Sequence, residues 1–303
     1  MSHLFGVPKN TGEHYITRID TWIMPKGQIK MNPPPPPQQT FGVPGKSEKY
    51  KGVKHTILVM SGKGGVGKST VAINLAISLG SLNRKVGIID ADINGPDDPK
   101  MLGVDKEQLY ATDKGIIPLD TKYGVSIISM AFLLQTDDTP VIWRGALRHK
   151  AVQQFLEDVS WEDMDYVVMD FPPGTGDEAL SVAQLVPDAE GVVIVATPQD
   201  VALLDVRQAL NFAGQLRLKV LGIVENMSGL KCPHCGQDID LFGSGGAENL
   251  SKKLNIDFLG KIPFIPEIVT NADSGIPGVA VNKVFSDAFE SIAKKIIDKV
   301  EKK

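Results

Sequence analysis

The stretch from residue 55 to residue 83 limits the fold of this chain more than any other segment does. HTILVM (55–60) is a short apolar run of the kind that forms a buried parallel strand. STVAINLAISLGSLN (69–83) has the apolar spacing of a helix, and GKGGVGKS between the two fits the pattern G-x-x-x-x-G-K-[ST]. A strand, a glycine-rich loop and a helix in this order predict an α/β fold that binds a nucleotide at the loop.

The loop contains the groups that bind phosphate. Its glycines let successive backbone N–H groups curl around an anion. Lys68 is placed to reach the β- and γ-phosphates, and the Ser69 hydroxyl is placed to ligate Mg²⁺. The pattern does not require a second lysine, yet Lys63 is present. The residues predicted to bind the nucleotide are Gly62, Lys63, Gly64, Gly65, Val66, Gly67, Lys68, Ser69 and Thr70.

Composition indicates an ordinary globular protein. The chain has 303 residues, of which 42% are hydrophobic and 22% charged, and its formal net charge is −4. A slightly acidic balance argues against nucleic acid as the main partner. No apolar leader opens the sequence, and no apolar run approaches the roughly 18 residues of a membrane helix. We therefore expect a cytoplasmic protein with no nucleic-acid or membrane partner.

Two regions of the chain differ in pattern. Residues 1–50 contain PPPPP and no sustained periodicity, which predicts a flexible proline-rich extension. Residues 51–303 predict one ATPase domain, in which apolar strands alternate with helices to form a mostly parallel β-sheet with helices on both faces. Strands are predicted at 55–60, 85–90, 125–129, 166–170, 191–197, 220–226 and 256–262, and helices at 69–83, 144–159, 177–186, 201–216, 246–254 and 284–302.

Polar residues follow several predicted strands, at the edge where parallel sheets bind ligands. Asp90 and Asp92 follow KVGII, a position from which a carboxylate can orient water toward a γ-phosphate. Asp170 ends YVVMD and is predicted to lie near Mg²⁺. Asn226 ends VLGIVEN, and its amide can both donate to and accept from the edge of adenine. The alternative for Asn226 is a simple turn residue.

The two cysteines of the chain, Cys232 and Cys235, lie in CPHCG and exclude a disulfide framework. C-x-x-C fits a dithiol redox site, but that chemistry favours a helix N-terminus, and GQDID after the motif is a poor helix start. A metal knuckle fits better because Gly236 lets backbone N–H groups approach sulfur, with His234 filling the turn. Closed zinc and iron–sulfur sites need four ligands, so two copies of the chain must share one site. On these residues alone zinc, an iron–sulfur cluster and a dithiol all remain open.

Together these motifs resemble those of the deviant Walker A ATPases, the group of MinD, ParA and the nitrogenase iron protein. Within that group the chain resembles the Mrp/ApbC family of iron–sulfur cluster carriers. The resemblance runs from about residue 50 to the end of the chain. The motifs that carry it are SGKGGVGKST, DADINGP, WRG (143–145), DFPPGTGD, ENMSG, CPHCG and FGSGGAENL (242–250).

The resemblance implies slow, Mg²⁺-dependent hydrolysis of ATP by a homodimer. It implies that Lys63 acts in trans on the nucleotide of the partner subunit while Lys68 acts in cis, which ties hydrolysis to dimer closure. It assigns the positioning of the attacking water to Asp92, with Asp90 as the second candidate. Lys63, Lys68, Asp92 and Asp170 are thereby implied as catalytic residues.

The resemblance also implies a role for the cysteines. Cys232 and Cys235 of two subunits hold one bridging [4Fe–4S] cluster, which the protein transfers to apo iron–sulfur proteins. The chain departs from the family after the paired aspartates, where it reads GPDDP instead of a sequence beginning GPS. Asp97 and Asp98 add negative charge near the polyphosphate, which puts the contacts of this loop in doubt.

Two alternative functions are a positioning ATPase of the ParA or MinD type and a zinc-knuckle ATPase with a regulatory role. A membrane-binding tail would favour the first, and the last predicted helix is the segment to inspect. Its acidic residues offset its lysines, which favours a helix that covers the core over one that binds membranes. The apolar stripe predicted to face the core comprises Val284, Phe285, Ala288, Phe289, Ile292, Ile296 and Val300.

Overall fold

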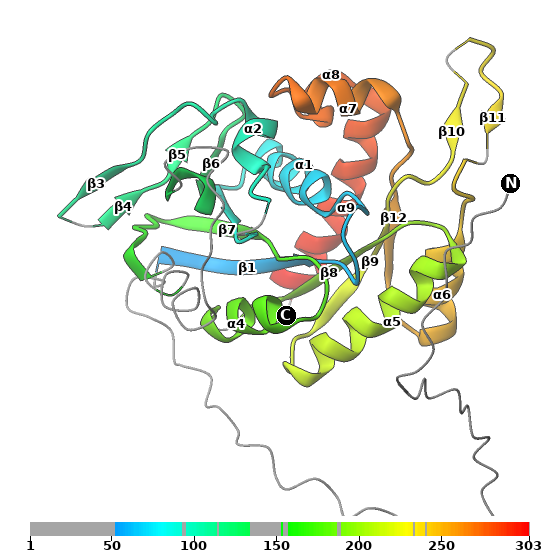
Figure 1. Cartoon of the computed structure of the whole chain (residues 1–303), viewed down its shortest axis with the longest axis horizontal. Coiled ribbons are helices and arrows are strands. Elements are labelled where there is room, and N and C mark those ends of the chain that lie inside the picture. The colour runs from blue at the N-terminus through cyan, green and yellow to red at the C-terminus, as the bar shows by residue number, and fades with distance from the viewer. Residues whose placement is uncertain are drawn as a thin grey trace, which may run out of the picture. The chain divides into compact units, whose positions relative to one another are not determined.

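The computed structural model describes most of the predicted ATPase domain (Figure 1). The described residues are 52–92, 95–113, 115–133, 153, 157–186, 189–232, 234–239 and 241–302. The predicted extension, residues 1–50, lies outside them, and so do the WRG motif and most of the helix predicted at 144–159.

An eight-stranded sheet forms the centre of the fold, with the strand order β12-β9-β8-β1-β7-β2-β6-β5. Its strands are β1 (Val53–Met60), β2 (Val86–Asp90), β5 (Leu119–Asp120), β6 (Val125–Ser129), β7 (Met164–Asp170), β8 (Gly191–Ala196), β9 (Val220–Glu225) and β12 (Phe258–Lys261). All neighbours pair in parallel except β5, which runs antiparallel to β6 at the edge. The predicted fold class, a mostly parallel sheet in an α/β protein, is confirmed, and every predicted strand is present.

Helices cover both faces of the sheet (Figure 1). One face carries α1 (Lys68–Ser81) and α9 (Lys283–Glu301), with α2 (Asp98–Leu102), α7 (Pro266–Asp273) and α8 (Gly278–Val281) beside them. The other face carries α4 (Asp177–Leu185), α5 (Asp200–Gln215) and α6 (Gly246–Leu254). Burial from both sides explains why the central strands are continuous apolar runs: every residue of β6 and β8 is buried.

Several short elements escaped sequence-based prediction. They include the helices α2, α7 and α8, the 3₁₀ helix η2 (Met130–Leu133) and two antiparallel hairpins, β3 (Tyr110–Thr112) with β4 (Gly115–Ile117) and β10 (Leu230–Lys231) with β11 (Asp238–Ile239). Helices of four to eight residues and strands of two or three residues are too short for a periodic pattern to identify them. The β10–β11 hairpin carries the cysteine motif, so this omission affects the functional site.

The last helix covers the core, as its charge pattern predicts. In α9 the side chains of Phe285, Phe289, Ile292, Ile296 and Val300 are buried against the sheet and α1. Val284 is a correction to the predicted stripe, because 63% of its surface is exposed. Among the helices in the described part of the chain, none combines the length and apolarity that crossing a bilayer requires.

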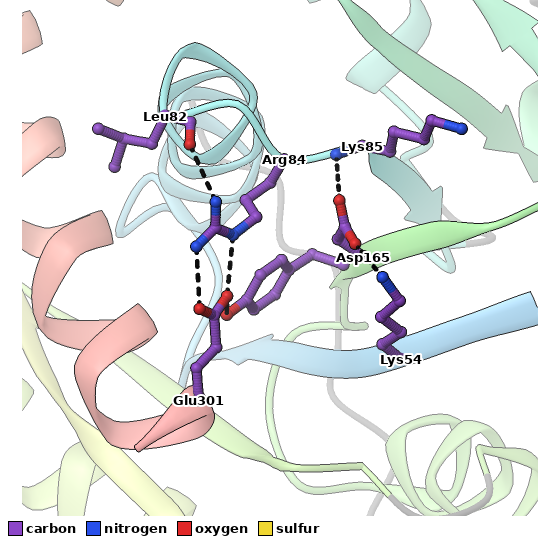
Figure 2. A network of polar contacts seen from close by, with 7 residues as sticks. Lys54, Leu82, Arg84, Lys85, Asp165 and Glu301 are labelled. Carbon is purple, nitrogen blue, oxygen red and sulfur yellow. Dashed lines mark hydrogen bonds and ion pairs between the residues drawn. The ribbon is translucent and has the colours of Figure 1, made fainter.

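A polar network fastens the end of α9 to the sheet (Figure 2). The guanidinium of Arg84 donates two hydrogen bonds of 2.9 Å to the Glu301 carboxylate, and the Tyr166 hydroxyl donates a third, of 2.8 Å. Nearby, Asp165 accepts from the Lys54 ammonium and from the backbone N–H of Lys85. These residues lie near the amino ends of β1, β2 and β7, away from the strand ends where a ligand is expected.

We expect Glu301→Gln to lower the free energy of unfolding by roughly 1 kcal/mol at neutral pH, because the pair with Arg84 is bidentate but partly exposed to solvent. The Arg84 guanidinium holds the pKa of Glu301 below its usual value of 4.5. The stabilisation is therefore complete above about pH 4.5 and is lost as the pH falls through the lowered pKa of the folded protein. Urea denaturation at several pH values measures it.

A matched control is Asp298→Asn, which removes a more exposed carboxylate of the same helix that pairs with Lys302. This control should change the urea midpoint little at any pH. Equal midpoints for the two variants at neutral pH would contradict a stabilising role for Glu301.

Candidate nucleotide site and cysteine hairpin

The phosphate loop, residues 62–70, leads from β1 into α1 with backbone geometry that only glycine adopts readily. Gly65 has φ 77° and Gly67, the N-cap of α1, has φ 79°. A Cβ atom at Gly67 would lie 2.2 Å from the amide nitrogen of Asn226, so space as well as conformation requires glycine there. The predicted strand–loop–helix unit is therefore present, with α1 beginning at Lys68.

Lys68 and Ser69 both contact Asp170 at the end of β7. The Lys68 ammonium donates to one carboxylate oxygen of Asp170 over 2.6 Å, and the Ser69 hydroxyl donates to the other over 2.6 Å. Burial lowers the pKa of Lys68, but the Asp170 carboxylate outweighs burial and raises the pKa above its usual value, so the ammonium stays charged. The fold thus brings Asp170 to two adjacent loop residues that lie about 100 positions before it in the sequence.

Two further aspartates lie beside Asp170. Asp90 is opposite Asp170 in the β2–β7 register and accepts hydrogen bonds from the Ser129 hydroxyl and the Asp92 backbone. Asp98, the first residue of α2, is fully buried, and neither of its carboxylate oxygens has a hydrogen-bond partner among the described residues. One oxygen from each of Asp90, Asp98 and Asp170 lies within 4.8 Å of the other two.

The two aspartates of GPDDP, which were expected to add negative charge near the polyphosphate, differ in burial. Asp97 is exposed, whereas Asp98 is buried next to Asp90 and Asp170. Burial, and then the charge of Asp170, raises the pKa of both Asp90 and Asp98 well above the usual value. Asp92 lies outside this trio, is half-buried, and accepts a 3.2 Å hydrogen bond from the backbone N–H of Gly95.

Lys63 lies beside an acid of its own chain. Its ammonium is 3.4 Å from the Asp205 carboxylate of α5, and its side chain is 37% exposed. The backbone at Gly62 packs so closely against Asp205 that a Cβ atom would lie 2.0 Å from the Asp205 carbonyl oxygen. Gly64 faces open space, since nothing lies within 4 Å of the position of its Cβ. The second lysine of the loop is thus accessible, and Asp205 is a partner that the sequence did not reveal.

Asn226 forms a hydrogen bond with the phosphate loop. Its amide nitrogen donates to the Val66 carbonyl over 2.9 Å, and the residue is 95% buried. The predicted contact with adenine stays a prediction, because the observed partner of this amide is the loop. Asn226 does line a cavity of about 460 Å³ next to the loop, whose wall also includes Gly65, Gly67, Thr70, Pro263 and Phe264. The cavity adjoins the phosphate-binding residues and is partly apolar, as a base-binding pocket is.

Glu225 forms hydrogen bonds to both ends of the segment that carries the cysteines, residues 228–247. Its buried carboxylate accepts from the Ser228 hydroxyl at 2.5 Å and from the backbone N–H groups of Gly245 and Ala247 at 2.7 Å each. The last two bonds provide acceptors for N–H groups at the start of α6. The glycines of FGSGGAENL have another reason: Gly243 and Gly245 both have φ 81°, and a Cβ atom at Gly246 would lie 2.0 Å from the Pro198 carbonyl oxygen. The sequence signal for Glu225 was a charged residue ending an otherwise apolar strand, and we did not interpret it.

The cysteine hairpin, residues 230–239, extends away from the sheet and helices (Figure 1). The Gly236 N–H donates to the Cys232 carbonyl over 2.9 Å, and Gly236 has φ 71°, so the turn requires glycine as expected. Backbone N–H groups of Cys235 and His234 point at the Cys232 sulfur and lower the pKa of its thiol. The chain then continues as strand β11, which confirms that no helix begins after the motif and disfavours a dithiol oxidoreductase.

Both thiols of the hairpin are accessible. Cys232 is half-buried and Cys235 is exposed, and neither forms a disulfide. Ile239 and Leu241, at the base of the hairpin, are exposed by 41% and 52%. Two thiols and exposed apolar side chains at one projecting loop are compatible with a site that a second molecule completes.

Comparisons with known proteins agree with this geometry. The family model described as ParA: NUBPL iron-transfer P-loop NTPase matches residues 52–299. A Methanocaldococcus jannaschii protein named iron-sulfur cluster carrier protein is 48% identical over 256 residues, which cover 84% of this chain and 88% of that protein. A Dictyostelium discoideum protein named cytosolic Fe-S cluster assembly factor NUBP2 homolog is 43% identical over 228 residues, covering 74% and 86%.

Two solved structures show the same fold. A nucleotide-binding protein from Archaeoglobus fulgidus in complex with ADP has a TM-score of 0.67 at 38% identity, covering 78% of this chain and 91% of its own. The cell division ATPase MinD of Pyrococcus furiosus has a TM-score of 0.58 at 23% identity, covering 80% and 98%. At that lower identity the similarity to MinD concerns the fold alone.

We expect Glu225→Gln to loosen the segment that carries the cysteines. An amide presents N–H where the carboxylate accepted, so at least one N–H at the start of α6 loses its acceptor, which costs about 1–3 kcal/mol of stability. Hydrogen–deuterium exchange should become faster over residues 242–250, and the urea midpoint should fall. The same substitution at an exposed position, Glu267→Gln, is the control and should change neither the exchange rate over residues 242–250 nor the urea midpoint. Unchanged exchange over 242–250 in the Glu225 variant would show that the carboxylate does not hold this segment.

Proposed function

Because the chain belongs to the NUBPL iron-transfer P-loop NTPase family, we propose that it is an ATP-binding and ATP-hydrolysing carrier that receives an iron–sulfur cluster and delivers it to apoproteins. The observation that carries the proposal is one chain with both an intact phosphate loop and an accessible thiol pair on a projecting hairpin. The names of the relatives from Methanocaldococcus jannaschii and Dictyostelium discoideum support the cargo, and the second name supports a cytoplasmic location.

The nucleotide site has the groups that Mg²⁺-dependent hydrolysis of ATP needs. Lys68 lies at the start of α1, where it can bind the β- and γ-phosphates. The Ser69 hydroxyl and the Asp170 carboxylate, 2.6 Å apart, form a hard oxygen donor set that fits Mg²⁺. When bound, Mg²⁺ neutralises charge on the phosphate oxygens. Asp92, half-buried at the end of β2, is the proposed residue that orients the attacking water, with Asp90 as the second candidate.

The proposed functional unit is a homodimer in which Lys63 acts on the partner's nucleotide. Two features of the described structure support this role. Lys63 is partly exposed, and the next residue, Gly64, faces open space. Asp205, which pairs with Lys63 in the single chain, lies in α5 next to Leu204, which is 62% exposed. Release of Lys63 from Asp205 would then accompany dimer closure.

The proposed cargo is one [4Fe–4S] cluster shared by two subunits. Each chain has two thiols, and such clusters take four thiolates, so two hairpins meet at one site. The exposed side chains of Ile239 and Leu241 give the two hairpins apolar surface to bury when they meet. A cluster held on a projecting loop between subunits can be passed on, and a nucleotide that changes how the subunits meet changes how tightly it is held. This coupling acts in both directions.

The two alternatives are less well supported. A positioning ATPase of the MinD type rests on similarity of fold alone, and the apolar side of α9, which could have served as a membrane-binding surface, is packed on the sheet. A zinc knuckle uses the same four thiolates, so metal analysis rather than geometry separates it from a cluster.

Lys68→Ala and Lys63→Ala should differ in their effects on ATP. Lys68→Ala should abolish binding of ATP in calorimetry, because the ammonium contacts phosphate within its own chain. Lys63→Ala should bind ATP with unchanged affinity, yet lose ATP-dependent dimerisation in light scattering and about a hundredfold or more of the hydrolysis rate. Lys106→Ala, at an exposed lysine outside the phosphate loop, is the control and should behave as the unaltered protein. Equal loss of ATP binding in the Lys63 and Lys68 variants would refute the action in trans.

Cys232→Ser and Cys235→Ser should each abolish cluster binding and leave ATP binding unchanged. After anaerobic reconstitution, the unaltered protein should become brown, contain about four irons per dimer and activate an apo iron–sulfur protein. His234→Ala is a control within the same turn and should retain the cluster, because His234 is not a proposed ligand. A protein that stays colourless after reconstitution and keeps stoichiometric zinc would reject the carrier function.

A further inference from the structure

Asp98 is a buried carboxylate that nothing in the described structure explains. It is fully buried, and neither oxygen has a hydrogen-bond partner among the described residues. Asp90 and Asp170, the other members of the trio, both accept hydrogen bonds. A buried, unpartnered carboxylate is strongly disfavoured and therefore indicates a missing ligand at this position.

The groups around Asp98 indicate that the missing ligand is a cation. One oxygen of Asp90 and one of Asp170 each lie within 4.8 Å of an Asp98 oxygen, so the ligand lies among three carboxylates, which favours a cation. The buried cation of the site, Lys68, directs its ammonium to Asp170. When all three carboxylates are ionised, Lys68 balances one of their negative charges and one divalent cation would balance the other two.

The spacing of the trio also suits a divalent cation. Carboxylate oxygens that share one such ion lie at most roughly 4–5 Å apart, and the oxygens of the trio lie within 4.8 Å of one another. All donors of the trio are hard oxygens, which favour Mg²⁺ or Mn²⁺ over the metals that thiolates prefer.

We propose that Asp90, Asp98 and Asp170 form a divalent-cation site that is occupied before any nucleotide binds. In the usual arrangement of phosphate-loop proteins, Mg²⁺ is held largely by the nucleotide phosphates together with the loop hydroxyl and one strand-end aspartate. Asp98 adds a protein ligand, so the ion no longer depends on the phosphates for its retention. ATP then binds to a protein that already contains the metal. The proposal does not depend on cluster transfer, because it concerns binding of the ion alone.

Titration of nucleotide-free, EDTA-stripped full-length protein with Mn²⁺ tests the proposal directly. Electron paramagnetic resonance of the unbound ion should show one tight Mn²⁺ per chain, which Mg²⁺ displaces. Asp98→Asn should weaken this binding about tenfold or more, as loss of a metal-site group does. Asp97→Asn is the matched control, because it removes the same charge from the adjacent, exposed residue, and it should leave the affinity nearly unchanged. The cysteine hairpin is present in all three proteins and cannot account for a difference among them.

Thermal unfolding gives a second readout that does not involve activity. Without metal, Asp98→Asn should melt higher than the unaltered protein, because the unpartnered charge is gone. Adding Mg²⁺ should raise the melting temperature of the unaltered protein and of Asp97→Asn, but not that of Asp98→Asn. If Asp98→Asn does not fold, as judged by circular dichroism, Asp98→Val takes its place because an apolar side chain suits a buried position.

Two results would overturn the proposal. One is Mn²⁺ binding that appears only when ATP or ADP is added. The other is equal Mn²⁺ affinity in the unaltered protein and Asp98→Asn, together with a lower melting temperature of that variant in EDTA, which would make Asp98 a structural residue.

Discussion

The buried contact between Lys68 and Asp170 is the interaction on which the site depends. It joins the first turn of α1 to the end of β7 across the centre of the sheet, with a donor–acceptor distance of 2.6 Å. A buried ion pair adds little net stability, but losing one partner leaves an uncompensated charge that costs about 3–5 kcal/mol. Because both partners are buried, the pair holds the first turn of α1 against the end of β7. The same carboxylate accepts from Ser69, so the lysine and the hydroxyl that a nucleotide needs are positioned by one residue.

A second link joins the phosphate loop to the cysteine hairpin through two adjacent residues. Asn226 bonds the Val66 carbonyl of the loop, while Glu225 bonds Ser228 and the start of α6, which flank the hairpin. Both residues are buried at the end of β9. The phosphate loop and the segment that carries Cys232 and Cys235 are thus hydrogen-bonded to neighbouring residues at the end of one strand.

The residues that stabilise the fold and those of the proposed sites lie at opposite ends of the strands. The network of Arg84, Tyr166 and Glu301 fastens the last helix near the amino ends of the strands. The aspartates, the phosphate loop and the cysteine hairpin all follow the carboxyl ends. Parallel strands bring all their carboxyl ends to one edge, so loops there can carry charged and reactive groups while the buried faces hold the structure together.

The amino-acid sequence by itself determined the fold class, the seven strands we predicted and the phosphate loop. Each of these depends on a local pattern: a continuous apolar run, a 3.6-residue period, or glycines at fixed spacing. The same local chemistry identified Asp170 at a strand end and the turn around Gly236, both of which the structure confirms. Short elements such as α2 and the β10–β11 hairpin have no such pattern and went unpredicted.

Only the tertiary structure determined which charged side chains lie next to one another. In the sequence nothing distinguishes the adjacent residues Asp97 and Asp98. In the fold Asp97 is exposed, whereas Asp98 is buried beside Asp90 and Asp170. The fold likewise paired Lys63 with Asp205 and gave Asn226 a partner in the loop. The contacts of Asp98 with Asp170, of Lys63 with Asp205 and of Asn226 with the loop join residues roughly 70 to 160 positions apart, and they escape the sequence for a physical reason. A side chain's burial and its charged neighbours are set by how strands and helices pack, and a local pattern contains no information about either.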